Sequence, residues 1–117
     1  MKKRDEGADA LEDVAGWIAA NVRAFYGHGR SHLSDGIMGW YGSVSANGVA
    51  VNGGIIKRQL EADGYESKII LRLWLSYEWI EPGDNGDVTK MVKIGPMSTR
   101  CVVIKTEALA PYLQIDL

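Results

Sequence analysis

The sequence predicts a single α+β domain in which three helices precede a β-hairpin. Three features lead to this expectation: a helical apolar pattern over 10–26, a pair of shorter helical patterns over 53–77, and two strand-like runs around Gly95-Pro96. Helices place apolar residues at steps of three and four, whereas strands favour β-branched residues. At 117 residues, the chain can bury a modest core without disulfides or metals.

The first predicted helix covers residues 10–26 and follows a charged tail at 1–9, which we expect to be flexible. Asp9 is the expected N-cap, because Glu12 stands three residues later as in a capping box. Gly27 and Gly29 are expected to end the helix. The apolar face consists of Leu11, Val14, Trp17 or Ile18, Val22 and Phe25.

Residues 27–47 show no clear periodicity and are expected to form an irregular segment. His28 and His32 lie four residues apart with Asp35 nearby, a spacing that permits a shared metal. No third ligand stands at a convincing spacing, so a polar loop is the favoured interpretation over a metal site. The aromatic residues at 40–41 are expected to anchor this loop.

Two short helices are predicted at 53–62 and 67–77. Asp63-Gly64 ends the first, since glycine readily adopts the left-handed conformation found at helix ends. Ser67 is the expected N-cap of the second, and the pair is a helix-turn-helix candidate. The apolar face of the second helix is expected to comprise Ile70, Leu73, Trp74 and Tyr77, with Trp74 largely buried.

The strands are predicted at 49–51, 88–94 and 99–105, the last two forming an antiparallel hairpin that turns at Gly95-Pro96. Cys101 falls inside the last strand, where a buried small side chain is a far better interpretation than a nucleophile. The apolar tail after residue 106 is expected to hold a turn of helix.

The predicted elements follow the order of a winged-helix domain: helix, irregular segment, short strand, helix, turn, helix and hairpin. We expect this domain to span 10–117. In that fold the last helix, here 67–77, enters the major groove of DNA. The hairpin, here 88–105, is the wing that lies along the DNA backbone.

Three segments carry a family resemblance: VAVNGGIIKRQLEADGY at 49–65, ILRLWLSYEWIEP at 70–82 and TKMVKIGPMSTRCVVI at 89–104. They resemble the C-terminal winged-helix region of primase-helicases and self-loading replicative helicases encoded by phages, plasmids and integrative mobile elements. Residues 24–31 and 38–40 are similar to the region just upstream in those proteins. The ending Arg-x-Val-x-Ile, at Arg100, Val102 and Ile104, matches their basic hairpin.

The resemblance implies a DNA-binding module that serves replication of a mobile element, as a domain or as a separate accessory protein. No G-x-x-x-x-G-K-[ST] phosphate loop occurs in these 117 residues, so they cannot themselves unwind DNA. The implied partners are duplex, forked or single-stranded DNA, together with a replication helicase or polymerase of the same element.

Charge gives limited support to DNA binding. The chain has a formal charge of −2, and residues 53–105 hold eight basic and seven acidic side chains, a balance of +1. A few clustered cations can still contact phosphates. The candidate DNA-binding residues are Lys57, Arg58, Lys68, Arg72, Lys93 and Arg100. The alternative is a protein-interaction adaptor on the same fold, using Trp40, Tyr41, Tyr112 or Leu113.

An enzyme is not expected, and neither a cofactor nor a metal is predicted. His28, Ser31, His32 and Asp35 are close in sequence, but a catalytic triad is assembled by the fold rather than by proximity in the chain. A single cysteine fits a reducing compartment. No apolar run reaches the length of a membrane span, and no secretory signal follows Met1. The expected location is therefore cytoplasmic.

Overall fold

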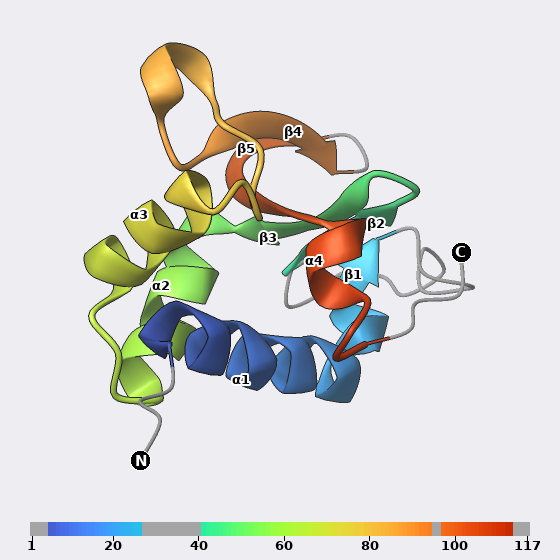
Figure 1. Cartoon of the computed structure of the whole chain (residues 1–117). Helices are drawn as coiled ribbons and strands as arrows, with labels where there is room; N and C mark the ends of the chain where they lie inside the picture. Colours follow the sequence, from blue (N-terminus) through green and yellow to red (C-terminus); the bar gives the residue numbers. More distant parts are fainter. Residues whose placement is uncertain (1–4, 27–40, 95–96, 114–117) are drawn as a thin grey trace.

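The computed structural model describes residues 5–26, 41–94 and 97–113. They form a mixed α+β domain in which the helices pack on one face of a curled five-stranded sheet (Figure 1). The helices are α1 (Glu6–Ala20), α2 (Gly53–Ala62), α3 (Ser67–Ser76) and α4 (Thr106–Leu109). The strands are β1 (Phe25–Tyr26), β2 (Gly42–Ser45), β3 (Gly48–Asn52), β4 (Lys90–Ile94) and β5 (Met97–Lys105).

The strand order is β1-β2-β3-β5-β4, and every neighbouring pair is antiparallel except β1 and β2. Val49 lies opposite Ile104, and Val51 lies opposite Val102. Directly opposed residues project from the same face, so these four side chains enter the main core together, beside Phe25 of β1 and Val44 of β2. Gly48 begins β3 with a φ of 155°, and a Cβ there would overlap the Ile104 carbonyl oxygen. Glycine is therefore required where β3 meets β5.

Three helices bury apolar side chains against this face of the sheet. The fully buried helical residues include Leu11, Val14, Ile18, Ile56, Leu60, Ile70, Leu71 and Trp74. The predicted burial of Trp74 is confirmed, since its exposed fraction is 0%. Its indole N–H donates a hydrogen bond of 2.9 Å to the carbonyl oxygen of Gly7. This bond ties α3 to the first turn of α1 and satisfies a buried donor.

α1 begins earlier than the predicted range of 10–26. Asp5 is its N-cap, and Asp9 lies inside the first turns of the helix, so the predicted capping box is wrong. The predicted flexible tail at 1–9 is also wrong from residue 5 onward. The hydroxyl of Tyr77 donates to Asp5 at 2.9 Å, which holds the start of α1 against α3. The start is also marked locally, because the Asp5 carboxylate accepts a hydrogen bond from the Gly7 amide at 2.8 Å.

α1 also ends earlier than predicted, at Ala20. The side-chain amide of Asn21 donates to the Trp17 carbonyl at 2.8 Å and satisfies an acceptor of the last turn. A 3₁₀ turn at Val22–Ala24 then redirects the chain. Phe25 consequently enters the core as a residue of β1, rather than as a residue of the helix.

The predicted helix at 53–62 is confirmed as α2, and the helix predicted at 67–77 is confirmed as α3 with its end at Ser76. Ser67 is not an N-cap, because it lies in the first turn and its hydroxyl donates to Glu61 Oε2 at 2.8 Å. The Ser67 hydroxyl thus links α3 back to α2 instead of capping its own helix.

The predicted apolar face of α3 is divided in the structure. Ile70 and Trp74 are buried as expected, and Leu71 is buried beside them. Leu73 is only half-buried, and Tyr77 is 39% exposed. The buried stripe is therefore shifted toward Leu71, and the side of α3 that carries Leu73 and Tyr77 reaches the surface.

The predicted strand at 49–51 is confirmed within β3, and the predicted hairpin is confirmed as β4 and β5. The turn expected at Gly95-Pro96 lies outside the described residues, although Ile94 pairs with Met97 on either side of it. The turn of helix expected in the tail is confirmed as α4. β1 and β2 were not predicted. Among the described residues, no helix has the length and apolar character needed to cross a bilayer.

Trp74→Ala is expected to lower the free energy of unfolding by roughly 3–5 kcal/mol, because it removes a fully buried aromatic ring. Thermal and denaturant unfolding would measure the change. Met97→Ala is a suitable control, since Met97 is 68% exposed at the start of β5. Equal stability of the Trp74 and Met97 variants would contradict the central role of this indole.

Candidate nucleic-acid interface

Three of the predicted cations meet where α2 and α3 approach the segment that leads into β4. Lys57 from α2, with Lys68 and Arg72 from α3, lines a surface hollow of about 290 Å³. Lys68 and Arg72 are four residues apart, so they lie one above the other on the same edge of α3. All three side chains are exposed. The remaining lining residues are Ser67, Leu71, Asp87 and Val88.

Arg100 adjoins this hollow through Asp87. The Arg100 guanidinium lies 3.5 Å from Asp87 Oδ2 and 3.4 Å from the Thr89 hydroxyl. Both Arg100 and Asp87 remain about half exposed, so their ion pair is weak and can be exchanged for another anion. Asp87 therefore stands between Arg100 and the lysines and arginine of the hollow.

The two cations of the β4–β5 hairpin, Arg100 and Lys93, project from the same face. Arg100 lies opposite Met91, and Lys93 lies opposite Ser98, so these four residues share a face. Strand alternation places Arg100 on the same side as Val102, which packs under the helices. The cationic side of the β4–β5 hairpin is thus the side on which α2 and α3 lie.

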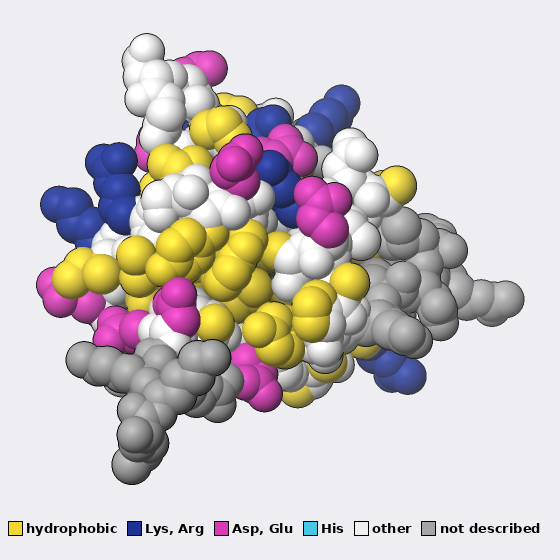
Figure 2. Space-filling view, viewed as in Figure 1, with side chains coloured by type: hydrophobic (Ala, Val, Ile, Leu, Met, Phe, Trp, Pro, Cys, Tyr) yellow, Lys and Arg dark blue, Asp and Glu magenta, His cyan; other side chains and the backbone are white. Residues whose placement is uncertain are grey.

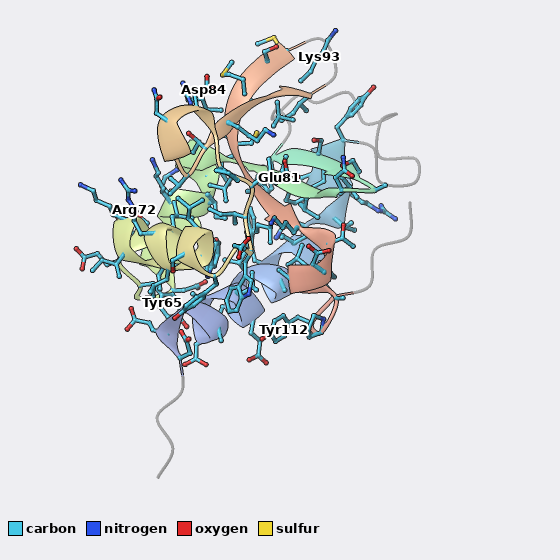
Figure 3. The ribbon with its side chains drawn as sticks, turned by 45° about the horizontal axis from the view of Figure 1, so that its top comes forward. Tyr65, Arg72, Glu81, Asp84, Lys93 and Tyr112 are labelled. Atoms are coloured by element: carbon cyan, nitrogen blue, oxygen red, sulfur yellow. The ribbon has the colours of Figure 1, made fainter. Side chains whose placement is uncertain are left out.

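Two of the six predicted residues stand apart from the hollow. Arg58 is exposed on α2 but does not line it. Lys93 lies near the outer end of β4, away from Arg72 on the outer side of α3 (Figure 3). The hollow and the end of the β4–β5 hairpin would therefore contact different parts of an extended ligand.

Asp87 lines the cationic hollow and contacts Arg100, but sequence analysis did not predict it as part of the binding surface. It belongs to the polar loop after α3, and Arg100 follows it thirteen positions later. No spacing rule connects a loop carboxylate with a strand residue at that distance. Lys90, the first residue of β4, is paired with an acidic residue: its ammonium group lies 3.0 Å from Glu81 Oε1. It is therefore less available to a ligand than the exposed cations of the hollow.

Cys101 is fully buried, as predicted. Burial raises the pKa of its thiol to about 11, so the thiol stays protonated at neutral pH. A protonated and inaccessible thiol is not a nucleophile. The residues considered for a metal, including His28, His32 and Asp35, lie outside the described residues. Across 5–26, 41–94 and 97–113, no three His, Cys, Asp or Glu side chains gather in a way that could hold a metal ion.

Comparisons with protein-family models and with curated proteins found no match for this chain. Its function is therefore inferred from the placement of its side chains.

The Cys101 thiol is expected to react with an aromatic disulfide reagent at least about tenfold more slowly in the folded protein than in denaturant. In the folded protein the thiol is protonated and the reagent cannot reach it. Absorbance of the released thiolate would follow the reaction. The unfolded chain supplies the reference rate. Similar rates in both states would mean that the sheet opens readily around Cys101.

Proposed function

We propose that this chain is a non-enzymatic winged-helix module that binds DNA weakly and with little sequence preference. It would serve as an accessory protein, or as a domain, of a replication helicase or primase of a mobile element. The observation that carries the proposal is the convergence of Lys57, Lys68 and Arg72 on one hollow, with Arg100 beside it. A phosphate group placed there would meet several donors at once.

The strand connections support the winged-helix assignment. β3, which precedes α2, pairs with β5, and β5 pairs with β4, so the strand before the helix pair joins the second strand of the wing. α2 and α3 follow β3 directly and are joined by a short turn, as in a helix-turn-helix. β1 and β2 extend the sheet beyond β3 without interrupting this order.

The chemistry of α3 favours phosphate contacts over base reading. Its long polar side chains are Lys68 and Arg72, and it contains no Asn or Gln, the amides that read adenine in the major groove. Phosphate contacts position a protein on DNA but carry no sequence information. Weak binding follows from the nearly neutral charge balance of 53–105 and from Asp87 inside the cationic surface.

The alternative function is a protein adaptor that does not touch DNA. Of the aromatic anchors first considered, Tyr41 stacks on Trp17 with ring centroids 5.6 Å apart, so it is engaged within the protein. Leu113 packs against the core, and Trp40 lies outside the described residues. Tyr112 remains 40% exposed and favours a protein-binding role for its own surface.

Replacing Arg72 and Arg100 together by Ala is expected to weaken binding about equally on unrelated DNA sequences. The logarithmic salt dependence should flatten by roughly two phosphate contacts. Fluorescence anisotropy with random duplex, forked and single-stranded DNA at two salt concentrations would measure both effects. Absence of wild-type binding to all three, at low salt and roughly tens of micromolar protein, would refute the DNA proposal in favour of the adaptor.

Asp87→Asn is expected to strengthen binding to every DNA by roughly two- to fivefold, the size of a surface charge interaction of up to about 1 kcal/mol. The reason is that the carboxylate repels phosphate and competes for Arg100. Glu107→Gln on α4 removes the same charge away from the hollow and should have less effect. Weaker binding by Asp87→Asn would instead show that the pair holds Arg100 in its binding position.

A further inference from the structure

α3 has a second exposed edge whose chemistry is opposite to that of Lys68 and Arg72. Ile69, Leu73 and Tyr77 recur at steps of four and form an apolar row along the helix. Ile69 is 48% exposed and Tyr77 is 39% exposed, although each is large and apolar. α3 thus presents a cationic edge on one side of its buried face and an apolar edge on the other.

The chain just after α3 extends this apolar row. Glu78 adopts a φ of 60°, and the amides of Glu78 and Trp79 donate back to Leu75 and Trp74 in the pattern of a Schellman motif. Glycine usually occupies the left-handed position of that motif, but this chain has Glu78 there. The turn returns Trp79 against Tyr77, with ring centroids 4.8 Å apart.

The surface continues from Trp79 toward α4. The Trp79 carbonyl accepts a hydrogen bond from the Lys105 amide at 2.9 Å, which brings the start of α4 alongside. Tyr112, just after α4, is 40% exposed. Figure 2 shows hydrophobic side chains spread from α3 across the centre of this view toward the α4 side. We call Ile69, Leu73, Tyr77, Trp79 and Tyr112 the apolar stripe.

Acidic side chains border this stripe on the α1 side. α1 and its N-cap contain no Lys or Arg, and two of their carboxylates bond to aromatic residues of the α3 region. Asp5 accepts from Tyr77, and Asp13 accepts from Tyr65 at 2.7 Å. In Figure 2 magenta carboxylates lie along both sides of the hydrophobic area, and those on the upper side lie beside dark blue Lys or Arg side chains. The acidic residues of α1, its N-cap, the end of α3 and α4 are Asp5, Glu6, Asp9, Glu12, Asp13, Glu78 and Glu107, whereas Glu81 is paired with Lys90.

We propose that the apolar stripe is a docking surface for a basic amphipathic segment of a partner protein. The apolar side of such a segment would cover Ile69, Tyr77 and Tyr112, and its Lys or Arg side chains would meet the acidic border. Charge complementarity selects this occupant, because DNA and acidic peptides are repelled by the same carboxylates. An isologous pair of copies would likewise place acidic borders against each other.

The docking surface is independent of DNA binding. It uses the edge of α3 that carries Leu73 and Tyr77, whereas the cationic hollow uses the edge that carries Lys68 and Arg72. One helix could therefore contact DNA and a basic protein segment at the same time, and either proposal can fail without the other.

Backbone amide NMR of the full chain, titrated with a synthetic Leu/Lys peptide of about 18 residues patterned as an amphipathic helix, tests this proposal. The matched probe is the same peptide with Glu at every Lys position. The basic peptide is expected to bind and to shift the amides around Ile69, Tyr77 and Tyr112. The acidic peptide is expected not to bind.

Ile69→Ser and Tyr112→Ser replace exposed residues, so both variants should retain the wild-type melting temperature. Combined, they should weaken peptide binding at least about tenfold, as expected for removing two anchors of a small interface. Met97→Ser, a similarly exposed apolar residue on the wing, is the matched control and should leave binding unchanged.

Three results would overturn the proposal. The first is no binding of the basic peptide, and the second is equal binding of the acidic peptide. The third is a concentration-dependent shift of the same amides in the protein alone, with a corresponding dimer mass, since a second copy would then be the occupant. Loss of peptide binding with intact DNA binding would leave the proposed function standing.

Discussion

The hydrogen bond from the Trp74 indole to the Gly7 carbonyl fixes how the helical layer is assembled. A buried indole N–H without a partner would be costly, so Trp74 can be fully buried only where an acceptor is supplied. The first turn of α1 supplies it, and a Cβ at Gly7 would crowd the Tyr77 ring at 3.3 Å. α1 therefore lies close against α3, and this contact sets the rotation of α3 about its own axis.

That rotation decides which residues of α3 reach the surface. Leu71 and Trp74 face the core, and as a result Lys68 with Arg72 and Leu73 with Tyr77 are left on opposite edges. This helix of ten residues therefore has a buried apolar side, an exposed cationic side and an exposed apolar side. The separation keeps the cations of α3 away from the acidic α1, which would otherwise neutralise them.

The loop between α3 and β4 places a carboxylate inside the cationic surface. Asp87 lies beside Arg100 and also lines the hollow of Lys57, Lys68 and Arg72. The negative charge of Asp87 lowers the positive potential at this hollow. This agrees with the small net charge of +1 that residues 53–105 carry. The arrangement suits binding that is reversible and depends on salt, rather than tight recognition of a sequence.

The sequence by itself determined the elements whose signals are local: α2 with its end at Asp63-Gly64, α3, the β4–β5 hairpin, and the burial of Trp74 and Cys101. Periodicity and turn residues act over a few positions, so they can be read without the fold. Tertiary structure alone decided the contact of Tyr77 with Asp5, the entry of Phe25 into a strand, and the meeting of Asp87 with Arg100. Each of these depends on contacts between residues far apart in the chain. Such contacts form only when the helices pack on the sheet, and no local pattern specifies them.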